Sequence, residues 1–305
     1  MKNILCLGLS TLLSANKSVL SKLIKGEKDS LLQTMKKNLI SFSIGFAILL
    51  LLGVSQWHHL KNAPFLLSFF YAFFALLAQA AFTLSVSIGP CSISTLFYSC
   101  GFVIPTLWGS MYYQEGFSIF ACLGLLCILA TFALFTQKDA SGKLSFSWLI
   151  TALLGFLGSG FMGVVQKIFI KTNPELSLSL FLIPAFAFVV ALGGLLVAIL
   201  WFFERKNRKN NTTKNPIKNK EKTKKEKTLS VVFTLGLGIT LGFVHTVNTY
   251  LAGAFPSYIT FPVINGGTIV LTGFFSYLYL KEPLTKKKII GFLTGIIGII
   301  LISIG

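Results

Sequence analysis

Hydrophobic residues run along this chain in long stretches that short polar segments separate. A helix that crosses a bilayer needs about 20 apolar residues, and by this measure the pattern predicts ten membrane-spanning helices. The segments between them carry Pro, Gly, Asn or Ser, which commonly end helices. The sequence therefore predicts an all-α membrane protein. The expected spans are 4–24, 38–55, 64–86, 91–113, 117–136, 147–170, 178–203, 229–252, 257–280 and 287–304.

Composition agrees with this pattern. Of the 305 residues, 54% are hydrophobic and only 12% are charged, whereas roughly a quarter of a soluble globular domain is charged. An ordinary soluble domain is therefore excluded. The five cysteines all lie in apolar runs, where a thiol behaves as a small hydrophobic group, so we expect no disulfide framework, no metal site and no cofactor.

The chain contains an internal repeat. Residues 113–118, followed by Gly124, align with residues 280–285, followed by Gly291, and segments 19–24 and 164–169 are more weakly similar. This predicts two units of five spans, residues 1–137 and 138–305. Because five is odd, the second unit must be inverted relative to the first, an arrangement that secondary transporters use for alternating access. Segment 204–228, rich in Lys, Asn and Thr, is expected to be a mobile linker between the seventh and eighth spans.

These repeats resemble the drug/metabolite transporter superfamily and its EamA-like ten-helix members. In each copy a helix with small residues and proline, 92–108 or 260–267, precedes a glutamate, and the next helix carries the glycine. The resemblance covers nearly the whole chain and is strongest over 84–136 and 251–304. It implies a basket of ten helices around a central substrate cavity, lined by the first, third and fourth helices of each repeat.

Charged residues are rare inside the expected spans. All nine acidic residues lie outside the spans or at their edges, which argues against a carrier that exchanges protons for cations through a buried carboxylate. Lys17 is well inside a span. Its ammonium faces either a cavity, where it attracts a substrate carboxylate or phosphate, or the headgroups, with its stem lying along the helix. Lys167, nearer a span end, is interpreted as facing the headgroups.

Other polar residues are candidates for the cavity wall. His245, Asn248 and Thr249 share one helix face, which should point into the bundle because lipid offers no hydrogen-bond partners. Such residues bind substrate or, more commonly, join helices. The full set of substrate-binding candidates is Asn16, Lys17, Gln79, Ser99, His245, Asn248, Thr249 and Asn265.

Two further features concern helix geometry. Gly266 and Gly267, in mid-span, either loosen the helix beside a cavity or permit close packing of a neighbouring helix. Glu115 and Glu282 stand at helix starts, where a carboxylate complements the helix dipole, and we interpret them as structural or gating elements.

The function predicted from these features is a secondary transporter that exports a small polar or amphipathic metabolite by alternating access. Its expected partners are that metabolite and membrane lipid, not nucleic acid. The sequence does not identify a coupling ion. The alternative is a non-transporting membrane protein, such as a lipid-handling flippase subunit or an intramembrane enzyme. Ser159 and His245 suggest a serine protease, but Leu157 stands where that family has glycine, so no enzyme is expected.

The location of the basic residues bears on orientation. Of 27 Lys and Arg residues, 22 fall in the loops that follow the odd-numbered spans. The positive-inside rule places these loops in the cytoplasm of a plasma (inner) membrane and both termini outside. The family resemblance implies cytoplasmic termini, and both orientations stay open here.

Overall fold

The computed structural model describes residues 2–24, 30–116, 118–135, 145–210, 224–281 and 285–304, and in these residues it contains helices and no strand. The helices are α1 (Lys2–Leu23), α2 (Leu31–Leu52), η1 (Val54–Asn62, a 3-10 helix), α3 (Phe65–Ile88), α4 (Cys91–Cys100), α5 (Val103–Tyr113), α6 (Ile119–Phe135), α7 (Phe146–Thr172), α8 (Leu178–Asn210), α9 (Lys224–Ala254), α10 (Ser257–Leu280) and α11 (Lys286–Ile304). The all-α prediction is therefore confirmed for these residues.

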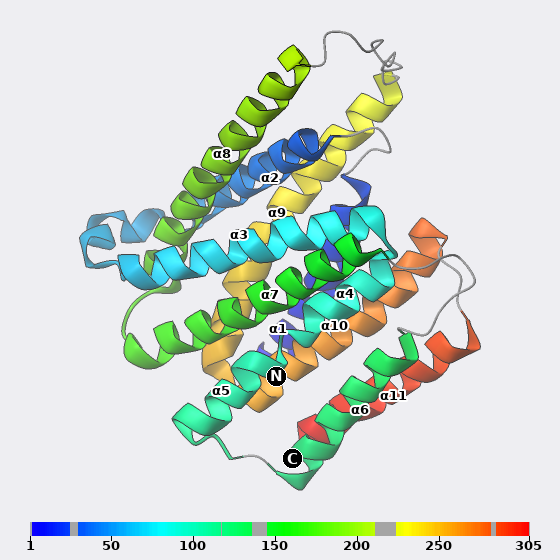
Figure 1. Ribbon diagram of the computed structural model, residues 1–305. Helices are drawn as coiled ribbons and strands as arrows, with labels where there is room; N and C mark the ends of the chain where they lie inside the picture. Colours follow the sequence, from blue (N-terminus) through cyan, green and yellow to red (C-terminus); the bar gives the residue numbers. More distant parts are fainter. Residues whose placement is uncertain are drawn as a thin grey trace.

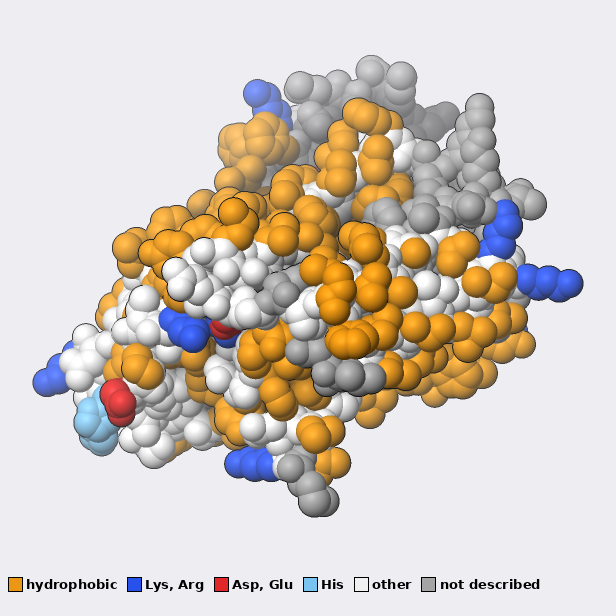
Figure 2. All heavy atoms as spheres, turned by 90° about the horizontal axis from the view of Figure 1, so that it is seen from below, with side chains coloured by type: hydrophobic (Ala, Val, Ile, Leu, Met, Phe, Trp, Pro, Cys, Tyr) orange, Lys and Arg blue, Asp and Glu red, His pale blue; other side chains and the backbone are white. Residues whose placement is uncertain are grey.

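Within the described chain, eight segments are long and apolar enough to cross a membrane, counting α4 and α5 together. The apolar parts of α6 and α11 are shorter, at Ile119–Thr131 and Ile289–Ile302. Hydrophobic side chains cover most of the face seen in Figure 2, and the few charged side chains lie mostly toward its edges. Lipid tails are the environment that such a surface fits, so the protein is a multi-pass membrane protein.

The expected fourth span is two helices, not one. Through the break between α4 and α5, the amides of Phe102 and Ile104 bond the carbonyls three residues earlier, at 3.1 Å each. Pro105 has no N–H to reach the Gly101 carbonyl four residues back, which explains why the α-helical pattern stops here. A Cβ on Gly101 would lie 2.1 Å from the Ser159 Oγ, so the break also lets α7 approach closely.

Helix ends differ from the expected spans where polar residues continue a helix. α2 begins at Leu31, seven residues before the expected start, because Ser30 and Gln33 form a capping box with hydrogen bonds of 3.1 and 3.2 Å. The linker expected over 204–228 is too long: α8 continues to Asn210 and α9 begins at Lys224. Lys and Glu are good helix formers once a helix has been nucleated. Residues 211–223 lie outside the described residues.

Helices from the two halves of the sequence are interleaved (Figure 1). α3 packs against α7 and α8, and α9 packs against α2 and α1. α1 also contacts α10, while α7 contacts α4 and α5, and α6 lies beside α11. Each α-helix of the first half therefore makes its most extensive contact with a helix of the second half.

Two helix ends share an uncommon backbone conformation. Gln114 and Lys281 are the two non-glycine residues with positive φ in the described chain, at 51° and 54°. Each follows the last residue of its helix, α5 or α10, and its N–H bonds the carbonyl five residues earlier, that of Gly109 or Ser276. The two residues occupy the same position in the two copies of the sequence repeat.

Candidate functional site: a central cavity and a closed end

A cavity lies between the two halves, and its wall comes from α1, α4, α5, α7, α9 and α10. Its volume is about 50 Å³, enough for a few water molecules but far below the several hundred Å³ of a typical ligand pocket. The family resemblance implies that the third helix of each repeat lines the cavity. α9, the third helix of the second repeat, does so, but α3, the third helix of the first, supplies no lining residue. In this conformation the cavity is therefore too small for a ligand of ordinary size.

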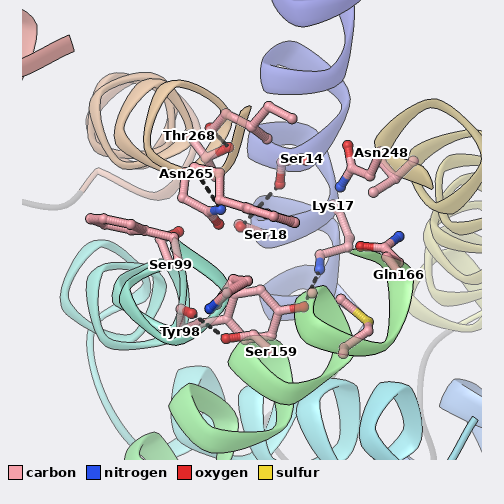
Figure 3. Close-up of a pocket in the computed structure, with 17 residues that line it drawn as sticks. Ser14, Lys17, Ser18, Tyr98, Ser99, Ser159, Gln166, Asn248, Asn265 and Thr268 are labelled. Atoms are coloured by element: carbon pink, nitrogen blue, oxygen red, sulfur yellow. Dashed lines mark hydrogen bonds between the residues drawn. The ribbon is translucent and has the colours of Figure 1, made fainter. Parts of the chain in front are cut away.

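Lys17 reaches the cavity from α1 together with Ser14 and Ser18, because residues at i, i+3 and i+4 share a helix face. Its ammonium donates a hydrogen bond of 2.9 Å to the Tyr98 hydroxyl and lies 4.3 Å from the centre of that ring (Figure 3). The side chain is 5% exposed. Of the two interpretations of Lys17, this geometry matches the cavity-facing ammonium.

No carboxylate pairs with Lys17 in the described part of the chain, where the ion pair found is between Lys167 and Glu115. The sequence also places every acidic residue outside the apolar spans or at their edges. A charge at this depth costs a few kcal/mol unless it meets water or a counter-charge. The cost of burying the Lys17 ammonium is offset in part by a hydrogen bond to the Tyr98 hydroxyl and by the nearby rings of Tyr98 and Phe82.

Three other predicted site residues line the cavity with Lys17: Ser99, Asn248 and Asn265. The Ser99 hydroxyl is buried and has no hydrogen-bond partner in the structure. The Asn248 side chain accepts a hydrogen bond from Ser10, and the Asn265 amide donates one of 2.8 Å to the Phe261 carbonyl. The cavity thus contains polar groups whose hydrogen-bonding capacity is only partly used.

His245 and Thr249 lie behind the cavity wall rather than in it. The His245 ring contacts the Tyr71 hydroxyl through Nδ1, and the Gln166 amide donates to Thr249 at 2.8 Å and to Tyr71 at 3.2 Å. These contacts join α3, α7 and α9. Of the two roles considered for this polar face, His245 and Thr249 perform the joining of helices, while Asn248 lines the cavity.

Gln79 and Asn16 are also placed away from the cavity. Gln79 is buried, and its amide donates to Ser21 at 3.0 Å and to Thr83 at 3.2 Å. Asn16 is exposed on α1, because adjacent residues of a helix point about 100° apart and Lys17 takes the inward direction.

Gly266 and Gly267 do not loosen their helix, since α10 is continuous from Ser257 to Leu280. A Cβ on Gly267 would lie 2.5 Å from Thr11 of α1, and one on Gly266 would lie 3.1 Å from Ile299 of α11. The glycines therefore permit close helix packing, and the expected loosening at 266–267 does not occur; the helix break found lies elsewhere, between α4 and α5.

Glu115 and Lys167 form an ion pair near the ends of α5 and α9. The Lys167 Nζ lies 2.6 Å from the Glu115 Oε1, and the Ser257 amide donates to Oε2 at 2.6 Å. Lys167 also donates to the carbonyls of Ala252 and Phe255, at 3.2 and 3.4 Å. We call Glu115, Lys167 and Ser257 the latch. Lys167 is 2% exposed, so the interpretation that it faces the headgroups is wrong.

The latch joins the loop after α5, in the first half, to α7 and the start of α10, in the second. Burial raises the pKa of Glu115, but the hydrogen bonds from Lys167 and Ser257 and the lysine charge outweigh burial, so the pKa falls below its usual value of 4.5. Glu115 is therefore ionised at neutral pH. Glu282, its counterpart in the repeat, lies outside the described residues.

The sequence profile of the EamA-like transporter family matches residues 146–304, more than half of the chain. The chain belongs to the EamA-like transporter family. No curated protein matches it in sequence. One solved structure, titled only "Crystal structure of protein", superposes with a TM-score of 0.69 and 12% identity, over 99% of this chain and 96% of that one. At this identity the likeness shows the fold alone.

Membership of this family indicates a transporter. The serine-protease alternative has no support from the geometry of this EamA-like protein. The Ser159 hydroxyl donates to the carbonyls of Tyr98, at 2.6 Å, and Phe156, at 3.0 Å, while His245 contacts Tyr71. The two side chains have different partners, so neither activates the other.

Several cavity residues were missed in the sequence, notably Tyr98, Met162 and Gln166. One signal was available for Met162 and Gln166. When the alignment of 19–24 with 164–169 is extended, Lys17 aligns with Met162 and Ser21 with Gln166. The polar face of α1 therefore predicts which face of α7 points inward. Nothing in the sequence distinguishes Tyr98 from an aromatic residue in the protein core.

Proposed function

We propose that this EamA-like protein is a secondary transporter that exports a small polar or amphipathic metabolite across the plasma membrane by alternating access. The observation that carries this proposal is a small cavity, lined by both polar and apolar side chains, between two interleaved halves that an ion pair joins. A cavity of about 50 Å³ admits no metabolite, so a substrate can enter only if the halves move apart.

The proposed architecture is two inverted five-helix repeats. Its first support is the reciprocal helix packing, in which α3 lies on α7 and α9 lies on α1. Its second is the matching backbone at Gln114 and Lys281. Its third is a matching pair of lysines: Lys22 near the end of α1 donates to carbonyls at the end of α3, including Gly89 at 2.8 Å, as Lys167 on α7 does at the end of α9.

Alternating access requires a gate at each end of the cavity, and we propose the latch as one gate. It is suited to this role because its partners come from different halves and an ion pair can separate when the halves rotate. With the ends of α7 and α9 on the latch face, most basic loops lie at the opposite face. If those loops are cytoplasmic, the latch lies on the outer side, and separation of the halves at the opposite end would load the carrier from the cytoplasm, which favours export.

Crosslinking tests the gate. In a variant without the five native cysteines, Glu115→Cys and Ser257→Cys are joined by a short bifunctional thiol reagent that a reductant cleaves. Purified protein in liposomes is incubated with a metabolite extract, and the retained solutes are measured by mass spectrometry. We expect crosslinking to lower retention at least tenfold and the reductant to restore it, while each single-cysteine variant is unaffected by the reagent. Full transport by the crosslinked protein would refute the gate.

A further inference from the structure

We propose that the substrate is an amphipathic monocarboxylate whose carboxylate pairs with Lys17. This inference rests on the proposed transport function and names the substrate class of the same cavity. It comes from three observations: the charge of the cavity, the hydroxyl donors in its wall, and the apolar side chains that also line it.

Among the described residues, the cavity wall carries one full charge, the Lys17 ammonium, and no acidic side chain. A cationic substrate would therefore meet a like charge and no counter-charge from these residues. A carboxylate carries one negative charge and would neutralise Lys17, whereas a phosphate monoester, with about two charges, would leave one uncompensated. The charge of the cavity therefore favours a monocarboxylate.

Hydroxyl groups in the cavity wall suit the two oxygens of a carboxylate. The Tyr98 hydroxyl accepts its hydrogen bond from Lys17 at 2.9 Å, so its own hydrogen is available to donate. Ser99, the next residue on α4, has a buried hydroxyl without a partner. A buried hydroxyl without a partner costs free energy, and a bound carboxylate oxygen would supply the acceptor that it lacks.

Part of the cavity wall is apolar. Met162 on α7 aligns in the repeat with Lys17 on α1, and Phe102 and Phe261 line the cavity as well. The two related helices thus contribute an ammonium and a thioether to the same cavity. This asymmetry suits a molecule with a charged end and a hydrocarbon or aromatic body, and it does not suit a small inorganic anion, which would leave the apolar wall without a contact.

The experiment identifies the transported solutes without assuming their structure. Liposomes with the wild type are incubated with a metabolite extract, and the solutes retained above protein-free liposomes are identified by mass spectrometry. Lys17→Met copies the residue at position 162, Lys17→Gln is a second neutral variant, and Lys17→Arg keeps the charge. Lys61→Met removes an exposed lysine of η1 as the matched control, and size-exclusion chromatography establishes that each variant is folded.

We expect the retained solutes to be monocarboxylates with an apolar body. Their retention should fall at least tenfold in both neutral variants, since a hydrogen bond to a charged group contributes about 1.5–3 kcal/mol. Lys17→Arg should keep a substantial part of the activity, and Lys61→Met should match the wild type.

Two results would overturn the monocarboxylate assignment while transport itself stands. One is retention of neutral, cationic or phosphorylated solutes in place of monocarboxylates. The other is undiminished carboxylate retention in a folded neutral variant. If the wild type retains nothing above protein-free liposomes, the proposed transport function fails, and the assignment that rests on it fails too.

Discussion

Two buried lysines on related helices have opposite surroundings. Lys17 on α1 is 5% exposed and Lys167 on α7 is 2% exposed. Lys167 has a carboxylate at 2.6 Å and two backbone carbonyls, whereas Lys17 has a tyrosine hydroxyl and aromatic rings. Similar burial therefore accompanies very different electrostatic environments.

The difference separates a structural charge from a binding charge. The Lys167 ammonium is neutralised within the chain, so its pairing energy is available to the folded protein in the absence of any ligand. The Lys17 ammonium has no such partner in the described residues, and the cost of its burial is met in part by Tyr98. Mutations at the two lysines should therefore change stability in opposite directions.

The largest effect is expected from Lys167→Met. Removing this cation leaves Glu115, whose side chain is 10% exposed, as a carboxylate without its ion-pair partner. Breaking a buried pair from one side typically costs 3–5 kcal/mol, and we expect about 3 kcal/mol here. The measurement is thermal unfolding of the purified protein in detergent.

The double variant Glu115→Gln with Lys167→Met is the control for this loss. Because no charge is left alone in it, it should recover more than half of the lost stability. An equal or greater loss in the double variant would show that Lys167 stabilises the fold through its stem and carbonyl contacts, not through the ion pair.

Lys17→Met should have a smaller effect of opposite sign. It replaces an ammonium without a counter-charge by a residue of similar length, and we expect the melting temperature to rise, by an amount corresponding to about 2 kcal/mol. A clear fall in melting temperature would mean that Lys17 is paired in the folded protein and would remove the contrast with Lys167.

Tyr98→Phe tests how much the Tyr98 hydroxyl stabilises the buried Lys17. It removes the hydroxyl that accepts from Lys17 and should cost about 1 kcal/mol, the usual contribution of one hydrogen bond. In the Lys17→Met background the same substitution should cost less, because the ammonium that needed the hydroxyl is gone. Equal losses in the two backgrounds would show that the hydroxyl acts independently of Lys17.

The smallest expected effect is the pH dependence of the latch. The pKa of Glu115 is below its usual 4.5 in the folded protein, so its stabilising contribution is fully present above about pH 4.5 and is lost as the pH falls through the folded value. Melting temperatures measured from about pH 7 down to about pH 2 should fall more in the wild type than in the Glu115→Gln variant, and the difference should appear below about pH 4.5. Parallel curves would exclude a contribution from this carboxylate.

The sequence predicts the fold better than the site, for a physical reason. Burial in lipid demands long apolar helices, so hydropathy locates each span to within several residues. Lys17 was found because a charge stands out in an apolar span. The break after Gly101 was missed, although the proline four residues later could have indicated it.

What the sequence does not contain is which helix lies beside which. His245 was a cavity candidate from its helix face, but Tyr71 on α3 occupies the space beside it. The latch joins Glu115 to Lys167, residues 52 positions apart in the chain, and neither residue alone indicates the pair. The roles of His245, Glu115 and Lys167 depend on contacts between different helices, and the local sequence pattern does not specify those contacts.

The interleaved packing has a consequence for how the protein is made. A ribosome releases α1, α2 and α3 into the membrane long before α9, α10 and α7 exist to cover them. The early helices must therefore remain inserted as separate spans, exposed to lipid and to quality-control proteases, until almost the last helix has been synthesised. The first half produced alone should be degraded, and co-expression of the two halves as separate chains should rescue both.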